Sequence, residues 1–149
     1  MAMDPNTDMA MYKRVYIPDL SDASNEYTLE HGIGDQFNST AFSKFVGFVY
    51  DRTSNTNWLA RCVDTTTTSE DTSVAVAADT WVELFWHYVA ADSSVYFYIN
   101  GSLVKTITTN IPADTTISVH WIDRITKSVG TTSRDVFLSG FQWEFYDAS

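Results

Sequence analysis

The chain has 149 residues, of which 44% are hydrophobic and 15% aromatic, and this composition suits one folded domain and excludes a disordered chain. Its net charge of -10 at pH 7 argues against nucleic acids and anionic membranes as partners, because both repel an acidic protein. Cys62 is the only cysteine, so no intrachain disulfide can form. No segment has the ~20 apolar residues that a membrane helix needs.

Residues 1–10 are polar and show no periodicity. They also lack the basic start and hydrophobic core of a secretory signal, so we expect no signal peptide. We interpret them as an N-terminal arm, followed by a single domain over residues 11–149. The arm is expected to reach a partner, with Met1, Asp4, Pro5 and Met9 as candidate contact residues.

Ten short segments alternate apolar and polar residues and are separated by turn residues, which predicts strands. They are residues 11–18, 27–31, 44–50, 58–63, 73–76, 81–90, 95–99, 103–107, 117–122 and 136–146. Segments 44–50 and 81–90 are both apolar on their two faces. For 44–50 this predicts a central strand, and for 81–90 it predicts a strand that is packed on one face and shielded on the other. The threonine-rich residues 65–68 are expected to form an exposed hairpin tip.

Asn100-Gly101 lies between two strand-like segments and predicts a type I′ hairpin, which needs positive φ at both residues. No segment of ten residues shows a convincing helical period, so no helix longer than two turns is expected. The fold class predicted is therefore all-β, with the strands arranged as a two-sheet antiparallel β-sandwich.

Several of these segments resemble the later strands of a concanavalin A-like (laminin G-like) jelly-roll. They are the tryptophan strand starting at Asp79-Thr80-Trp81, the aromatic strand with its Asn-Gly turn over residues 95–104, and Asn110-Ile111-Pro112. With its turns rich in Asn, Thr and Ser, the chain is similar to jelly-rolls of tailed-phage virion proteins. That resemblance implies a capsid decoration or fibre-type domain, assembled in the host cytoplasm and displayed on the virion surface.

The acidic side chains do not form the pattern of a hydrolase. Glycoside hydrolases on this fold carry Glu-x-Asp-x-x-Glu on one strand, which supplies the acid and the nucleophile or base. None of the five glutamates has a partner at that spacing: Glu26, Glu30, Glu70, Glu83 and Glu144.

Metal and cofactor sites also lack a sequence pattern. His31, His87 and His120 are too scattered to indicate zinc. Loop aspartates could collect around calcium, although such residues are more often simply solvated, and the candidates are Asp35, Asp92, Asp114 and Asp123. We expect no cofactor.

Exposed tryptophans can stack on sugar rings, and Trp58, Trp86 and Trp121 are the candidate glycan contacts. Trp81 and Trp143 are expected to fill the core. The leading hypothesis is a non-enzymatic virion protein that contacts capsid proteins and copies of itself. The alternatives are a carbohydrate-binding module or lectin, with cell-surface glycan as partner, and a truncated glycoside hydrolase-like domain.

Overall fold

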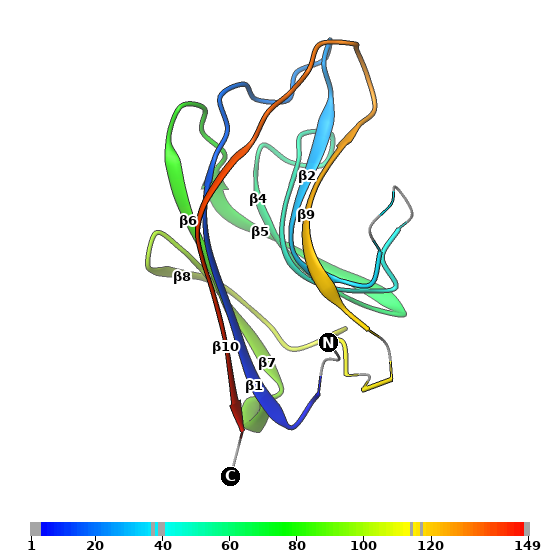
Figure 1. Cartoon of the computed structure of the whole chain (residues 1–149), viewed down its shortest axis with the longest axis vertical. Coiled ribbons are helices and arrows are strands. Elements are labelled where there is room, and N and C mark those ends of the chain that lie inside the picture. Colours follow the sequence, from blue (N-terminus) through cyan, green and yellow to red (C-terminus); the bar gives the residue numbers. More distant parts are fainter. Residues whose placement is uncertain (1–3, 37, 39–40, 114, 117, 148–149) are drawn as a thin grey trace.

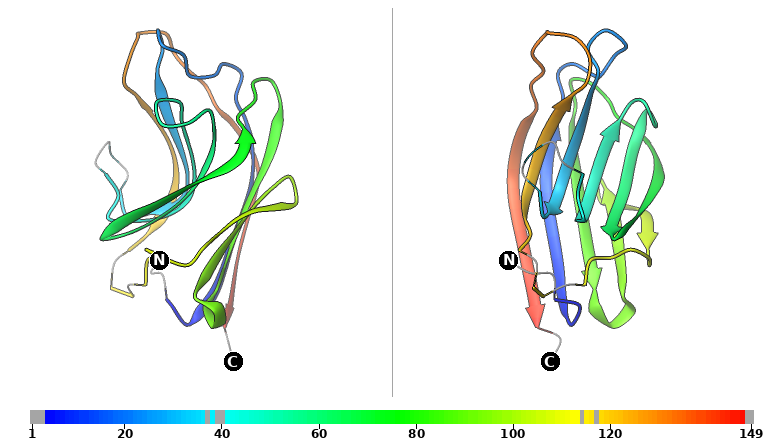
Figure 2. Two further views of the ribbon diagram at one scale, coloured as in Figure 1. Left: turned by 180° about the vertical axis from the view of Figure 1, so that it is seen from behind. Right: turned by 90° about the vertical axis from the view of Figure 1, so that its right-hand side faces the viewer.

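The computed structural model describes residues 4–36, 38, 41–113, 115–116 and 118–147, except for the side chains of residue 141 and residues 143–147. Ten antiparallel strands form two five-stranded sheets that lie face to face (Figure 1, Figure 2). Sheet A has the order β10-β1-β6-β7-β8, and sheet B has the order β5-β4-β3-β2-β9. The predicted all-β jelly-roll sandwich of the concanavalin A-like type is confirmed.

The strands of sheet A are β1 (Thr7–Tyr16), β6 (Trp81–Val89), β7 (Ser94–Ile99), β8 (Ser102–Ile107) and β10 (Phe137–Asp147). Those of sheet B are β2 (Tyr27–Gly34), β3 (Lys44–Asp51), β4 (Asn57–Asp64), β5 (Thr66–Ala75) and β9 (His120–Lys127). A single 3-10 turn, η1 (Ala90–Asp92), is the only helical element of the described residues. Across those residues no helix is long and apolar enough to span a membrane.

Three strands differ from the sequence-based expectation. β1 begins at Thr7, because the inward-facing Met9 joins the core with 2% of its surface exposed. The threonine-rich tract belongs to the edge strand β5 rather than to a hairpin tip, which suits the β-branched side chain of threonine. β9 begins at His120, and residue 117, where we expected it to start, lies outside the described residues.

The central position of β3 agrees with the prediction from its sequence. β3 lies in the middle of sheet B and β6 in the middle of sheet A. Between the sheets, the rings of Phe48 and Phe97 meet edge to face with their centroids 5.3 Å apart. This contact joins β3 to β7 and stands at the centre of a continuous hydrophobic core.

Gly32 of β2 and Gly47 of β3 are paired residues on neighbouring strands of sheet B. A Cβ atom on Gly32 would lie 2.1 Å from the carbonyl oxygen of Val46, and one on Gly47 would lie 2.2 Å from that of His31. Real Cβ atoms do not approach so closely. The two strands can therefore adopt this spacing only with glycine at both positions.

The two sides of the sandwich are closed differently. On one side, β5 is joined to the segment after β8, because Thr66 donates to the Asn110 side chain at 2.7 Å and Asn110 donates to Thr68 at 2.9 Å. On the other side, the inward-facing residues of β9 remain partly exposed: Trp121 at 43% and Ile125 at 37%. Side chains of the described residues therefore cover the β5–β8 side more fully than the β9–β10 side.

Candidate functional site

The predicted glycan-contact tryptophans do not share one environment. Trp58 and Trp86 point into the core with 1% of their surface exposed, so neither ring can stack on a ligand. Their assignment as glycan contacts is therefore corrected. Trp121 is 43% exposed, and Trp81, expected in the core, is 39% exposed. The side chain of Trp143 lies outside the described residues.

The N-terminal residues contact their own domain. The carbonyl of Pro5 accepts a hydrogen bond from the Tyr88 hydroxyl at 2.9 Å, and Asp4 accepts one from the backbone N–H of Asn6 at 2.9 Å. Met9 is buried in the core, which contradicts its expected role in contacting a partner. Met1 lies outside the described residues.

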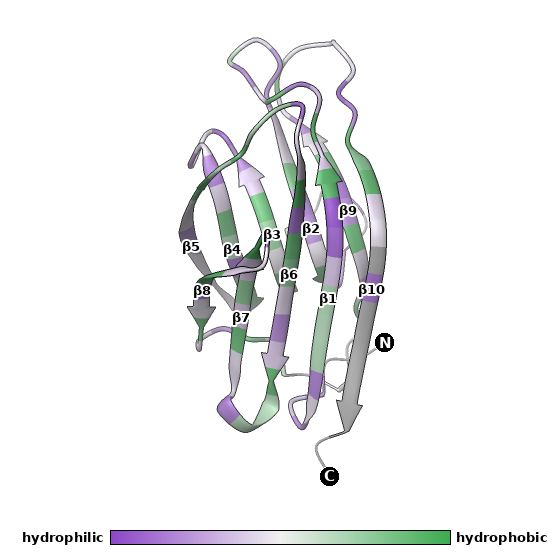
Figure 3. Ribbon diagram, turned by 90° about the vertical axis from the view of Figure 1, so that its left-hand side faces the viewer, coloured by the Kyte–Doolittle hydropathy of each residue, from purple (hydrophilic) through white to green (hydrophobic). Residues whose placement is uncertain are grey.

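The outer face of sheet A carries a group of aromatic side chains. Inward-facing residues of β1 and β6 alternate with Tyr12, Tyr16, Trp81 and Phe85, which point to the outside together with Tyr96 and Tyr98 of β7. We call these six residues the aromatic face. Figure 3 looks onto this side of the molecule, with β8, β7, β6, β1 and β10 side by side.

Strand register creates two clusters within the aromatic face. Tyr12 lies opposite Phe85, and Phe85 lies opposite Tyr98, with the Phe85 and Tyr98 ring centroids 5.4 Å apart. Further along the strands, Tyr16 lies opposite Trp81, with the same centroid separation of 5.4 Å. Rings from three strands are thus held in one layer by backbone pairing.

Charged groups lie between the two clusters. The Arg14 Nε atom is 3.9 Å from a Glu83 carboxylate oxygen, and its guanidinium carbon lies 5.3 Å from the centroid of the Trp81 ring. Partial desolvation and the nearby Glu83 carboxylate raise the pKa of Tyr12. Tyr12 therefore keeps its proton at neutral pH and can donate a hydrogen bond.

Tyr12, Glu83, Phe85, Tyr98 and Gly101 line a shallow hollow of about 450 Å³ on this face. It combines ring faces with a carboxylate and a phenol, and these are the groups that recognise a hydroxylated ring with apolar C–H surfaces.

The outer face of sheet B is a less open alternative. Phe45, Val49 and Ile122 are buried there, and Phe42 stacks on Phe45 with a centroid distance of 4.6 Å. Two of its charged groups pair with each other, because Arg124 Nε donates to Glu30 at 2.6 Å. This face is therefore packed as a small second core.

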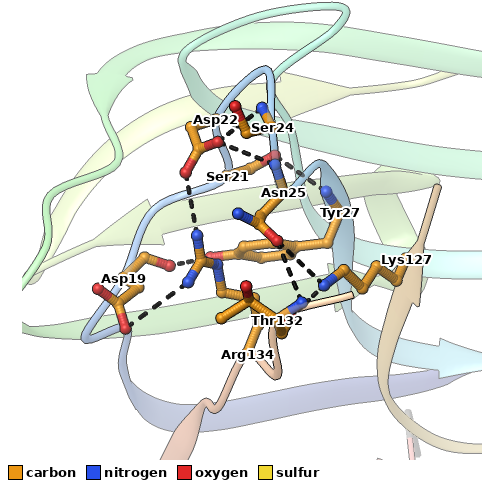
Figure 4. Close-up of polar contacts among 9 residues, drawn as sticks. All are labelled: Asp19, Ser21, Asp22, Ser24, Asn25, Tyr27, Lys127, Thr132 and Arg134. Carbon is orange, nitrogen blue, oxygen red and sulfur yellow. Dashed lines mark hydrogen bonds and ion pairs between the residues drawn. The ribbon is translucent and has the colours of Figure 1, made fainter. Parts of the chain in front are cut away.

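A cluster of polar side chains joins two loops at one end of the sandwich (Figure 4). Arg134, which follows β9, donates to the Asp22 carboxylate at 2.9 Å, and Asn25 accepts from the backbone N–H of Thr132 at 3.3 Å. Tyr27 donates to the carbonyl of Asp19 at 2.8 Å, and burial raises the pKa of Tyr27. These contacts fix loops rather than form a reactive site.

Metal ligands do not gather in the described part of the chain, where no group of three or more His, Cys, Asp or Glu could hold an ion. The aspartates considered for calcium accept hydrogen bonds from nearby groups. Asp35 accepts from the backbone N–H groups of Ser43 and Lys44, and Asp92 accepts from the Tyr96 hydroxyl. Asp123 binds His31. Asp114 lies outside the described residues.

Residues 6–138 match the model of the family described as SO2946-like, C-terminal domain. The chain belongs to this family. No curated protein sequence shows significant similarity to it.

Several solved structures have the same fold as this chain. Alginate lyase AlyC3 has a TM-score of 0.63 at 8% identity, over 96% of this chain and 66% of the lyase. Protein SO2946 from Shewanella oneidensis MR-1 has a TM-score of 0.57 at 13% identity, over 97% of this chain and 56% of the other. Family 7 alginate lyase A1-II′ has a TM-score of 0.56 at 8% identity, over 100% of this chain and 65% of the lyase. The chain thus spans between 56% and 66% of the length of these structures.

Two expectations from the sequence are corrected by these comparisons. The expected tailed-phage virion protein is wrong, because the matches are an SO2946-like domain and alginate lyases. The expectation that the domain is not an enzyme is also contradicted, since several of the similar structures are enzymes. A lyase requires neither the hydrolase carboxylate pair nor water as a reactant, so the missing Glu-x-Asp-x-x-Glu pattern does not exclude lyase activity.

Proposed function

We propose that this domain acts on polysaccharides and holds the glycan chain on the aromatic face of sheet A. The row Tyr12–Phe85–Tyr98 beside the Glu83 carboxylate carries the proposal, because it presents ring faces and hydrogen-bonding groups in one open hollow. Aromatic rings stack on the C–H side of a sugar, and the carboxylate accepts from its hydroxyls. The carbohydrate-degrading enzymes among the similar structures support the same substrate class.

The two clusters of the aromatic face suit a chain rather than a single sugar. Tyr12 and Tyr16 lie four residues apart on β1, which corresponds to about 13 Å at ~3.3 Å per strand residue. A ligand that contacts both clusters must extend along the strand. An oligosaccharide is therefore expected to bind more tightly than its monosaccharide.

Calorimetric titration with alginate oligosaccharides and with neutral oligosaccharides tests this proposal. Phe85→Ala and Tyr98→Ala should each weaken binding by about five- to tenfold, since an aromatic contact contributes about 1 kcal/mol. Val129→Ala is the control, because Val129 is exposed at 41% and follows β9 outside the aromatic face. Equal affinity of all three variants and the wild type would refute the assignment of this face.

Elimination at a uronate sugar is a second candidate activity, favoured by Arg14 lying among aromatic groups. In such a step a base removes the proton next to the sugar carboxylate, a double bond forms, and the glycosidic oxygen leaves with a proton from an acid. Arg14 can neutralise the carboxylate, His87 on the same face can take the proton, and protonated Tyr12 can supply one to the leaving oxygen.

The unsaturated product of elimination absorbs ultraviolet light, which gives a direct assay on alginate. Activity that is lost in Tyr12→Phe and His87→Asn, with glycan binding retained, would establish the elimination. If the wild type binds glycan but forms no unsaturated product, the second candidate is wrong and the binding proposal stands.

A further inference from the structure

A small, mostly apolar cavity lies at the end of the sandwich where the chain passes from β5 to β6. Its volume is about 70 Å³. Inward-facing side chains of β1 and β4 form part of its lining, including the fully buried Val15 and Trp58. Further apolar lining comes from the end of β5 and the segment after it, which contributes the exposed Ala77. The cavity therefore suits a small apolar group.

Two polar side chains, those of Thr80 and Asn100, also line this cavity. The Thr80 hydroxyl donates to the carbonyl of Ala78 at 3.2 Å. The side-chain oxygen of Asn100 accepts from the backbone N–H of Glu83 at 2.9 Å, which fixes the amide and leaves its NH2 group to donate to a ligand. An oriented hydrogen-bond donor beside an apolar space suits a group that combines a carbonyl with a methyl.

The cavity adjoins the aromatic face. Trp81 lines the cavity and also belongs to the aromatic face, where its ring lies beside that of Tyr16. Gly101, the residue after Asn100, lines the hollow together with Glu83. Trp81 and Glu83 are two residues apart on β6, which corresponds to about 7 Å at ~3.3 Å per strand residue. One oligosaccharide can therefore occupy the hollow and place a substituent in the cavity.

The volume limits this substituent to about three non-hydrogen atoms. A cavity of about 150 Å³ in a protein core takes a benzene ring, so about 70 Å³ suits half as many atoms. An acetyl group has this size, with a methyl carbon, a carbonyl carbon and a carbonyl oxygen. A carboxylate is equally small, but burying its charge is costly without a cationic partner, and the described residues that line the cavity include no arginine or lysine.

We propose that this cavity binds the acetyl group of an acetylated oligosaccharide held on the aromatic face. The methyl group packs against Val15 and Trp58, and the carbonyl oxygen accepts from the NH2 group of Asn100. The acetyl group can belong to an O-acetyl ester or to an N-acetyl amide, because both carry the same methyl and carbonyl. The inference rests on the proposed function and adds the substituent by which the domain selects its glycan.

Calorimetric titration of the full chain with two matched pairs of glycans tests the proposal. The first pair is O-acetylated alginate oligosaccharides and the same material after alkaline deacetylation. The second pair is the β-1,4-linked trisaccharide of N-acetylglucosamine and that of glucose. In at least one pair the acetylated member should bind about tenfold more tightly, because a buried methyl group and one hydrogen bond each contribute about three- to fivefold.

The outcomes separate this proposal from the proposed function. Equal affinity within both pairs would overturn the acetyl site and leave glycan binding on the aromatic face in place. If none of the four glycans binds, the proposed function is wrong and the acetyl site falls with it. A preference in the first pair alone identifies the ester, and one in the second pair alone identifies the amide.

Two variants locate the preference in the cavity. Ala77→Leu fills the space, so it should reduce the preference to about twofold or less without changing the affinity for the unacetylated glycan. Asn100→Asp keeps the acceptor for the Glu83 N–H but removes the donor, and should lower the preference about threefold. Ala91→Leu is the matched control, since Ala91 is also exposed and lies in η1, at the other end of β6. A preference of wild-type strength in both Ala77→Leu and Asn100→Asp would show that the acetyl group binds elsewhere.

Discussion

Asp123 and His31 are a pair of titratable residues whose charges are set by opposing effects. Desolvation alone would raise the pKa of Asp123, but the bonds from His31 and Lys13 outweigh it and lower that pKa. Burial lowers the pKa of His31 against the opposite influence of Asp123. At neutral pH an anionic Asp123 therefore faces a neutral His31.

This group predicts two steps in the stability of the protein on acidification. Below about pH 6.5, the usual histidine pKa, the unfolded chain protonates His31 before the folded chain does, so the free energy of unfolding falls. Below about pH 3.9, the usual aspartate pKa, the contribution of Asp123 is lost for the same reason. Urea denaturation at a series of pH values measures both steps, and His31→Asn should remove the first. A first step unchanged in His31→Asn would contradict this assignment.

At the scale of elements, the Asn100-Gly101 turn fixes the β7–β8 hairpin. Both residues have positive φ, 50° and 78°, as the type I′ prediction required. A Cβ on Gly101 would meet no atom within 4 Å, so any cost of substitution comes from the backbone conformation. Gly101→Val should lower the free energy of unfolding by about 1–2 kcal/mol, as measured by urea denaturation, whereas Ser102→Ala should change it little. Equal stability of both variants would contradict the turn assignment.

From the loop contacts of Arg134 we predict how much each of its two carboxylate partners contributes to the free energy of unfolding. Its bond to Asp22 is 2.9 Å long, but its nearest approach to Asp19 is 3.9 Å and the Asp19 side chain is 70% exposed. Arg134→Met should therefore lower the free energy of unfolding by about 1–2 kcal/mol, and Asp19→Asn by less than about 0.5 kcal/mol. Thermal denaturation in low and high salt measures both changes. A larger effect of Asp19→Asn than of Arg134→Met would contradict this ranking.

Individual elements show how far the sequence could predict the structure. The apolar segment 44–50 was sufficient to predict that β3 lies in the centre of a sheet, and segment 81–90 predicted β6 as a strand covered on both faces. The same property hid the orientation of β6, because both alternating sets are apolar and only pairing with β1 shows that Trp86 points inward and Trp81 outward. Tyr12, Phe85 and Tyr98 of the candidate site are remote in sequence, so strand register alone could bring them together.

At the scale of the whole molecule, the two sides of the sandwich should differ in dynamics. Asn110 joins the β8 end to β5 through Thr66 and Thr68, so Asn110→Ala should speed hydrogen exchange of β8 amides by about tenfold, equivalent to ~1.4 kcal/mol. Exchange in β9, on the other side, should not change in this variant. Acceleration that is equal in β8 and β9 would instead indicate global destabilisation.

The facing glycines of β2 and β3 have a consequence for how the chain finds its native pairing. Close approach of these strands requires a missing side chain on both at the same level, and Gly32 and Gly47 meet that condition together. A slipped alignment that sets Glu30 opposite Gly47 would place a Cβ where the native spacing leaves no room. The glycine pair therefore favours the native register of β2 and β3, and we expect hairpins with a slipped register to be disfavoured early in folding.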